Sequence, residues 1–407
     1  MIDAETNGKD GQTMSKWIPA WRYVPIDYNQ DVGVFENITQ KCVFTNNLNG
    51  SKVRIRFNNL YRDEEMHIQH VAVTLRNRNT GKSSDRIPVT LNGSEEICIA
   101  PNSEVYSDEI LCAVTWEDDF LVNMYFKEKT VVRSVCTIST GYSWQSSHHT
   151  GNFHETDALG FTFKPKLVPA LANDPSPLQF VVGIDEISVY NEDGAQLIGM
   201  FGDSITHMSY VSDPFLTMLY QRFPGKYSVI NGGISGNRIQ KKYPLCVGFP
   251  GEGHQFGIAG KDRFLKDMYS GAWPDIVFIM QGVNDCSHSL VFNEADVPTA
   301  EDIYGALCAV IRLAQEQGSK AYITTITPFG AFGDPWRPAA EELRCRYNEL
   351  IREGAAADDW IDLDAVMRDP EDPHRMQDGM HMGDGVHPNW AGGTKMAKAI
   401  FNKWFQE

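Results

Sequence analysis

The spacing of hydrophobic and polar residues changes near residue 192. Before that point the chain consists of short segments that alternate. Residues 53–57, for example, read Val-Arg-Ile-Arg-Phe, as expected of a strand with one buried face. Further strands are predicted at residues 39–44, 67–75, 104–112, 120–126 and 180–190. Turn-forming runs separate them, and long helical periodicity is absent from the pattern. Residues 1–192 are therefore predicted to form an antiparallel β-sandwich of jelly-roll type.

From residue 193 onwards, continuous apolar runs alternate with helical patterns. Runs of this kind are typical of parallel strands covered on both faces, and they occur at residues 197–201, 227–230, 276–280, 321–325 and 360–363. Helical patterns cover residues 302–317, 341–353 and 390–404, and Thr299 and Asp302 have the spacing of a capping box. Residues 193–407 are therefore predicted to form a doubly wound, flavodoxin-like α/β domain with a parallel sheet.

The composition of the chain argues against two classes of partner, nucleic acids and membranes. The chain of 407 residues carries 36 basic and 53 acidic residues and has no basic cluster, which argues against nucleic acid. No apolar run is long enough to span a membrane, and residues 1–16 have no apolar signal segment, so we expect no membrane partner and a cytoplasmic location. The eight cysteines lack Cys-x-x-Cys spacing and are expected to be reduced. The oligomeric state stays open, and a homo-oligomer is possible.

Candidate chemistry begins at the end of the run 197–201. The segment Gly202-Asp203-Ser204 follows it directly, and active sites of open α/β sheets lie at the carboxyl ends of the strands. Ser204 is therefore a candidate nucleophile, although a helix N-cap serine is the structural alternative. A serine nucleophile needs a base and a group that orients the base. Asp384 and His387 are three residues apart and precede a helical pattern, but Asp378 and His381 repeat the same Asp-Gly-x-His form six residues earlier.

Three further blocks follow Ser204, at residues 231–236 (Asn-Gly-Gly-Ile-Ser-Gly), 282–285 (Gly-Val-Asn-Asp) and 384–389 (Asp-Gly-Val-His-Pro-Asn). In this order the blocks resemble the GDSL/SGNH hydrolase family. The resemblance implies a serine esterase in which Ser204 is the nucleophile, His387 the base and Asp384 its orienting group. It also implies that the oxyanion is held by Ser204, Gly236 and Asn284. His387 is favoured over His381 because Pro-Asn and a helix follow it.

The substrate is predicted from architecture, which is weaker evidence than the site itself. Residues 17–21 and 52–59 resemble the β-domain of a two-domain subset of these hydrolases, some of which remove acetyl groups from glycans. This implies a short-chain ester substrate, either a small molecule or an oligosaccharide carrying O-acetyl groups. Alternatives are a lysophospholipase or thioesterase with the same triad, and a glycan-binding protein with a dead hydrolase domain.

We expect no cofactor and no catalytic metal. The histidines at 148, 149 and 154 and those at 374, 381 and 387 do not have the spacing of a zinc centre. Two segments rich in glycine and aromatic residues, 248–254 and 328–336, are candidate walls of the substrate site.

Overall fold

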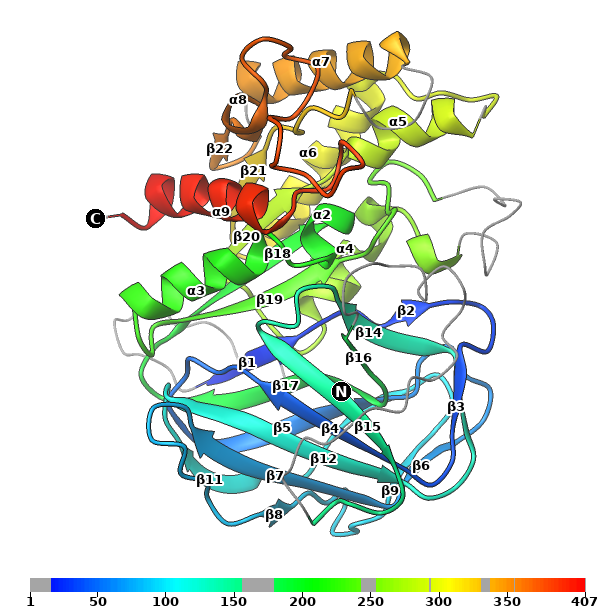
Figure 1. The fold of residues 1–407 in the computed structure, drawn as a ribbon, viewed down its shortest axis with the longest axis vertical. Helices are drawn as coiled ribbons and strands as arrows, with labels where there is room; N and C mark the ends of the chain where they lie inside the picture. Colours follow the sequence, from blue (N-terminus) through cyan, green and yellow to red (C-terminus); the bar gives the residue numbers. More distant parts are fainter. Residues whose placement is uncertain are drawn as a thin grey trace.

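A computed structural model describes residues 16–155, 179–242, 254–292, 294–330, 337–354 and 356–406. Figure 1 shows antiparallel strands in the lower part of the molecule and a helix-covered sheet above them. The change from antiparallel to parallel pairing falls between β17 (Ile184–Asn191) and β18 (Gln196–Gly202). The division into domains at residue 192 stays a prediction.

Two large antiparallel sheets make up most of the first region. One has the order β1-β17-β5-β10, with β11 also paired to β5, and its remaining strands are β1 (Lys16–Arg22), β5 (Gly50–Asn58), β10 (Glu104–Tyr106) and β11 (Ile110–Val114). The other has the order β15-β4-β12-β7-β8 and consists of β15 (Trp144–Thr150), β4 (Ile38–Phe44), β12 (Asp118–Phe126), β7 (His70–Asn77) and β8 (Ile87–Pro88). Trp21 of the first sheet lies 4.3 Å from Phe44 of the second, ring centre to ring centre. The two sheets therefore share a core, as in a β-sandwich.

Three smaller antiparallel sheets complete this region. They are β2 (Ile26–Asp27), β14 (Ser134–Ile138) and β16 (Gln179–Val181) in one sheet, β3 (Gly33–Phe35) with β13 (Thr130–Val132), and β6 (Met66–Ile68) with β9 (Ile97–Ile99).

The parallel sheet has the order β19-β18-β20-β21-β22. Its other strands are β19 (Tyr227–Gly233), β20 (Ile276–Met280), β21 (Lys320–Thr324) and β22 (Asp359–Ile361). Counted from β18, this is the 2-1-3-4-5 order of flavodoxin-like folds. The winding reverses between β18 and β20, where such sheets bind their ligands.

Helices cover both faces of the parallel sheet (Figure 1). They are α2 (Ser204–His207), α3 (Ser212–Arg222), α4 (Gly260–Tyr269), α5 (Val283–Val291), α6 (Ala300–Glu316), α7 (Pro338–Glu353), α8 (Leu363–Met367) and α9 (Trp390–Trp404). Phe201 of β18 packs on Phe264 of α4, whereas Phe278 of β20 packs on Phe215 of α3 and Trp404 of α9. Phe201 and Phe278 thus reach opposite faces of the sheet.

The two regions meet along β1 and β19. Ser228 of β19 donates a hydrogen bond to the carbonyl of Pro19 at 2.6 Å, and Tyr23 pairs with Asn231 in a parallel bridge. Buried apolar side chains continue across this contact without a break. The antiparallel region therefore supports the edge strand of the sheet that carries the candidate site.

The predicted fold class is confirmed, and the capping box of Thr299 and Asp302 is present at the start of α6. Three expected strands are wrong in extent, because residues 67–75, 104–112 and 180–190 each form two strands. At Gly183, between β16 and β17, the backbone has φ of 82°, a conformation that interrupts a strand and that glycine adopts without strain. No helix in the described part of the chain is both long and apolar enough to cross a membrane.

Candidate active site

The candidate nucleophile lies on a tight turn between β18 and α2. Gly202 ends the strand, and a Cβ atom there would lie 2.0 Å from Thr206 Oγ1 and 2.6 Å from the Met280 carbonyl oxygen. Only glycine therefore permits this close approach of strand and helix. Asp203 caps the helix by accepting the Ile205 backbone N–H at 3.1 Å. Ser204, the first helical residue, is 6% exposed.

Ser204, His387 and Asp384 form a chain of hydrogen bonds. His387 Nε2 lies 2.8 Å from Ser204 Oγ, and His387 Nδ1 lies 2.5 Å from Asp384 Oδ2. An ionised carboxylate only accepts hydrogen bonds, so Nδ1 carries the proton, and Nε2 of the neutral ring accepts the serine hydroxyl. The structure thus brings together three residues that the sequence analysis selected, two of them 183 positions apart.

Electrostatics keeps Asp384 ionised. Partial burial alone would raise the pKa of this carboxyl, but the hydrogen bond from His387, its charge, and backbone N–H groups lower the pKa to about 2. The backbone donors are Val386 and His387, both 3.0 Å from Asp384 Oδ1. One carboxyl oxygen therefore holds the loop while the other holds the imidazole.

His381 holds this loop through two hydrogen bonds to its backbone. Its Nδ1 accepts the backbone N–H groups of Gly383 at 3.0 Å and Gly385 at 3.1 Å, so Nδ1 is unprotonated. Both glycines have positive φ, 97° and 79°, which suits residues without a Cβ. In the sequence alone, His381 is an alternative to His387 as the catalytic base. In the structure it instead fixes the turn that holds Asp384 and His387.

The three candidate oxyanion donors follow adjacent strands. Ser204 follows β18, Gly236 follows β19 and Asn284 follows β20, so all three lie at the same edge of the sheet. Gly236 has φ of 76°, and a Cβ there would lie 2.0 Å from the Phe256 ring. The backbone N–H groups of Ser204 and Gly236 have no hydrogen-bond acceptor among the described residues.

Asn284 joins the start of α5 to the loop after β19. Its Nδ2 donates a hydrogen bond to the Asn237 carbonyl at 3.0 Å, which uses one of two amide hydrogens. The neighbouring Asp285 accepts the backbone N–H groups of Ile239 at 2.9 Å and Gln240 at 3.0 Å. Both residues therefore fasten the loop after β19 to the start of α5.

Arg263 of α4 holds the carboxyl ends of β18 and β19 together, and the sequence analysis missed it. The buried guanidinium donates to the carbonyls of Gly202 and Gly232, each at 2.8 Å, and to Asn237 Oδ1 at 2.9 Å. Asp267 balances its charge at 2.7 Å. An isolated arginine on an amphipathic helix gives no sequence signal for such a role, because the carbonyls that it bonds come from distant segments.

The antiparallel region also contacts the candidate site. His207, in the last turn of α2, lies 2.8 Å from Thr137 Oγ1 of β14 and 2.7 Å from Ser235 Oγ. The exposed rings of Tyr142 and Trp390 lie 5.4 Å apart. Tyr142 belongs to the β14–β15 connection, and Trp390 comes three residues after His387. None of these inter-region contacts was predicted from the sequence.

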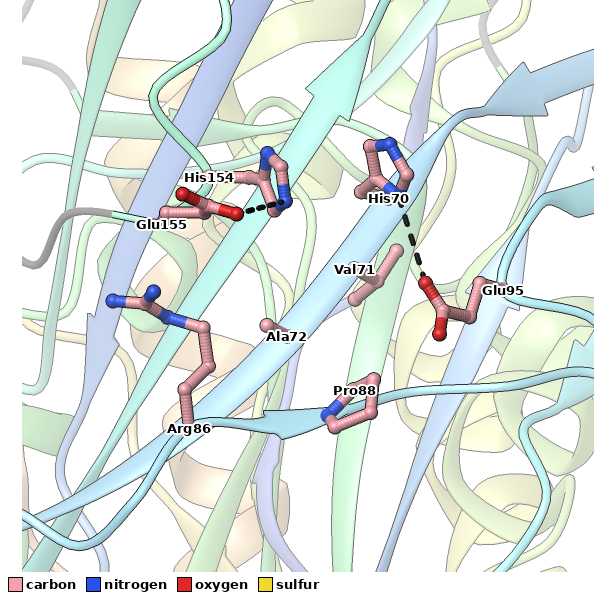
Figure 2. A pocket seen from close by; sticks show the side chains of 8 residues that line it. All are labelled: His70, Val71, Ala72, Arg86, Pro88, Glu95, His154 and Glu155. Carbon is pink, nitrogen blue, oxygen red and sulfur yellow. Dashed lines mark ion pairs between the residues drawn. The ribbon is translucent and has the colours of Figure 1, made fainter.

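The first region contains a separate pocket of about 290 Å³, shown in Figure 2. Five charged or titratable side chains line it, one of them Arg86. The rings of His70 and His154 stack 4.4 Å apart, with Glu95 beside the first and Glu155 beside the second. None of the candidate active-site residues lines it.

Parts of the two expected loops lie outside the described residues, namely 248–253 and 331–336. Phe329 is described, and it is buried, not exposed as its loop position suggested.

Part of the chain is similar to a known protein family. Residues 200–394 match the sequence model of the GDSL-like Lipase/Acylhydrolase family. A multidomain esterase of Ruminococcus flavefaciens is 30% identical over 176 residues, which is 42% of this chain but only 20% of that protein.

Solved structures are similar over about half of the chain. A GDSL-like lipase from Bacteroides thetaiotaomicron is 19% identical, with a TM-score of 0.37, over 51% of this chain and 87% of its own. A catalytic mutant of an acetylxylan esterase from Geobacillus stearothermophilus is 20% identical, with a TM-score of 0.38, over 51% and 93% of the two chains.

Proposed function

Residues 200–394 of this chain form a GDSL-like lipase/acylhydrolase domain, and from this premise we propose that the protein is a serine esterase that uses Ser204, His387 and Asp384. The observation that carries the proposal is the continuous hydrogen-bond chain from Ser204 Oγ through His387 to Asp384, at 2.8 and 2.5 Å. Distances of this length allow direct proton transfer between heavy atoms.

In the proposed reaction, Ser204 Oγ attacks the acyl carbon as its proton passes to His387 Nε2. The imidazolium is stabilised by the ionised Asp384, and it then protonates the leaving alkoxide as the carbon–oxygen bond breaks. Water next attacks the acyl-enzyme, giving its proton to His387, and the acid leaves as Ser204 is reprotonated. These steps require no metal or cofactor.

The tetrahedral oxyanion is assigned to the backbone N–H groups of Ser204 and Gly236 and the side-chain amide of Asn284. Support comes from their shared position at the carboxyl ends of β18, β19 and β20, and from backbone N–H groups that have no acceptor among the described residues. Each preorganised donor of this kind is worth roughly 3 kcal/mol in the transition state.

For the substrate we propose short-chain esters, namely O-acetyl groups on carbohydrates. Support comes from the ring pair of Tyr142 and Trp390, which are 52% and 43% exposed. Trp390 follows His387 by three residues. Exposed aromatic rings offer an apolar face with a polar edge, which suits the C–H face and hydroxyl rim of a sugar ring.

The test is p-nitrophenyl acetate hydrolysis by the wild-type protein and Ser204→Ala. We expect the variant to lose turnover by a factor of about 10⁴ or more while keeping its circular dichroism spectrum. Undiminished turnover would refute the mechanism. Acetylated oligosaccharides and an acyl series from acetyl to palmitoyl then test the substrate. Preference for long acyl chains would favour a lysophospholipase or thioesterase, and glycan binding without cleavage would indicate a dead hydrolase.

A further inference from the structure

The small sheet of β6 and β9, with the residue that precedes each strand, carries four polar side chains. Its register pairs His67 directly with Cys98. Glu65 and Glu96 directly precede the two strands, and both lie against the ring of His67. The intervening residues, Met66, Ile68, Ile97 and Ile99, are buried in the core. The outer face of this pair therefore carries two carboxylates, an imidazole and a thiol, far from the residues of the proposed active site in the sequence.

Two distances to His67 Nδ1 match those between ligands of one metal ion. Cys98 Sγ lies 3.4 Å from His67 Nδ1, and Glu96 Oε1 lies 3.5 Å from the same nitrogen. With zinc bonds of about 2.3 Å to sulfur and about 2.0–2.1 Å to nitrogen and oxygen, tetrahedral ligands are separated by roughly 3.4–3.6 Å. Ligand atoms from Glu65, His67 and Cys98 also lie within 4.8 Å of one another.

Glu65 occupies the other side of the ring. Its Oε1 lies 2.8 Å from His67 Nε2, which leaves Nδ1 facing Cys98 and Glu96. A carboxylate in this position is the usual partner of a metal-bound histidine, because it fixes the tautomer and makes the ligand more basic.

We propose that His67, Cys98 and Glu96 bind a zinc-class divalent cation, with Glu65 orienting His67 and with water free to complete the coordination. A thiolate and an imidazole select zinc over magnesium or calcium, which prefer oxygen ligands. On binding, the thiol of Cys98 releases its proton to solvent and sulfur bonds to the metal, with no redox change. The bond joins two strands that are about 30 residues apart in the chain, so the ion acts as a structural clip outside the proposed catalytic centre.

Charge supports this assignment. The carboxylates of Glu65 and Glu96 lie 2.8 and 3.5 Å from the ring nitrogens of His67, and their negative charge attracts a divalent cation.

The pocket in Figure 2 has a different character. His70 and His154 stack on each other, and each faces its own glutamate, Glu95 or Glu155. Arg86 also lines this pocket, and its positive charge opposes binding of a cation. His70 therefore provides a control histidine close to the proposed metal cluster, only three residues after His67.

The experiment uses the full chain, reduced and stripped of metal, titrated with CoCl₂ and then with ZnCl₂ against a chromophoric chelator. Wild-type protein is expected to develop a sulfur-to-cobalt charge-transfer band and to bind one zinc ion per chain. Cys98→Ser should lose the band. Glu65→Gln should keep it but weaken zinc binding about 10–100-fold, the range found for partners of ligating histidines.

Cys112→Ser and His70→Asn are the matched controls, and both should bind metal as the wild type does. Zinc should also raise the melting temperature of wild-type protein but not that of Cys98→Ser, because ligands stabilise only the state that binds them. A band that persists in Cys98→Ser, or zinc binding no tighter in the wild type than in that variant, would overturn the proposal. Circular dichroism verifies that each variant is folded.

Discussion

Replacing Asp384 by asparagine separates the orientation of His387 from the folding of its loop. The carboxylate accepts His387 Nδ1–H through Oδ2 and two backbone N–H groups through Oδ1. In the variant, the amide oxygen can keep the backbone bonds, but the NH₂ group then faces Nδ1. A donor in that place favours the tautomer with the proton on Nε2, which cannot accept the hydroxyl proton of Ser204.

The expected effect on stability is small. The pKa of Asp384 falls from 3.8 to about 2, which corresponds to at most about 2.5 kcal/mol at roughly 1.4 kcal/mol per unit. Since 36% of the side chain is exposed, solvent screening reduces this contribution to about 1 kcal/mol. The effect on catalysis is much larger, because the wrong tautomer in a serine triad costs about 10⁴ in kcat, equivalent to about 5 kcal/mol in the barrier.

The assay compares kcat on p-nitrophenyl acetate with the free energy of unfolding in urea. Asp378→Asn is the matched control, since Asp378 occupies the same place in the earlier Asp-Gly-x-His repeat and its side chain is 92% exposed. This control should keep both activity and stability. A loss of kcat below tenfold in Asp384→Asn, with the protein folded, would refute the argument that Asp384 sets the tautomer.

Three further outcomes are expected. Arg263→Met should lower the free energy of unfolding by about 3–5 kcal/mol in urea denaturation, since Asp267 and two strand-end carbonyls lose their buried partner. A loss under about 1 kcal/mol would contradict the role of Arg263 in holding the ends of β18 and β19 together. His381→Ala should lower kcat more than it changes KM, and His381→Asn should recover part of the loss because its amide oxygen can accept the same N–H groups; equal activity of both variants would argue against positioning. Burial raises the pKa of Asp203 to about 7, so the folded state retains a proton that the unfolded state releases between about pH 4 and 7, and stability should fall as pH rises through that range. Asp203→Asn should remove this fall in urea midpoints measured from pH 4.5 to 8, and parallel curves for the two proteins would show that Asp203 does not cause it.

The sequence by itself determined the elements and their class. Alternation at residues 53–57 and continuous apolar runs such as 276–280 report which faces of a strand are buried, and this is local information. The order of the four blocks placed Ser204, Gly236 and Asn284 after successive strands. Because parallel strands end at one edge of the sheet, that order predicted their neighbourhood without any coordinates.

Only the tertiary structure decided which side chains meet across distant segments. The contact of His207 with Thr137, the clamp of Arg263 on two strand ends, and the pairing of His67 with Cys98 depend on strand register and helix placement. Periodicity tells which face a residue occupies but not which residue lies opposite, because a partner 30 or 70 positions away leaves no trace in the local pattern. The role of His381 shows the same limit. The two Asp-Gly-x-His segments that contain His381 and His387 look alike in sequence, and they differ in the atoms that the two imidazole rings bond.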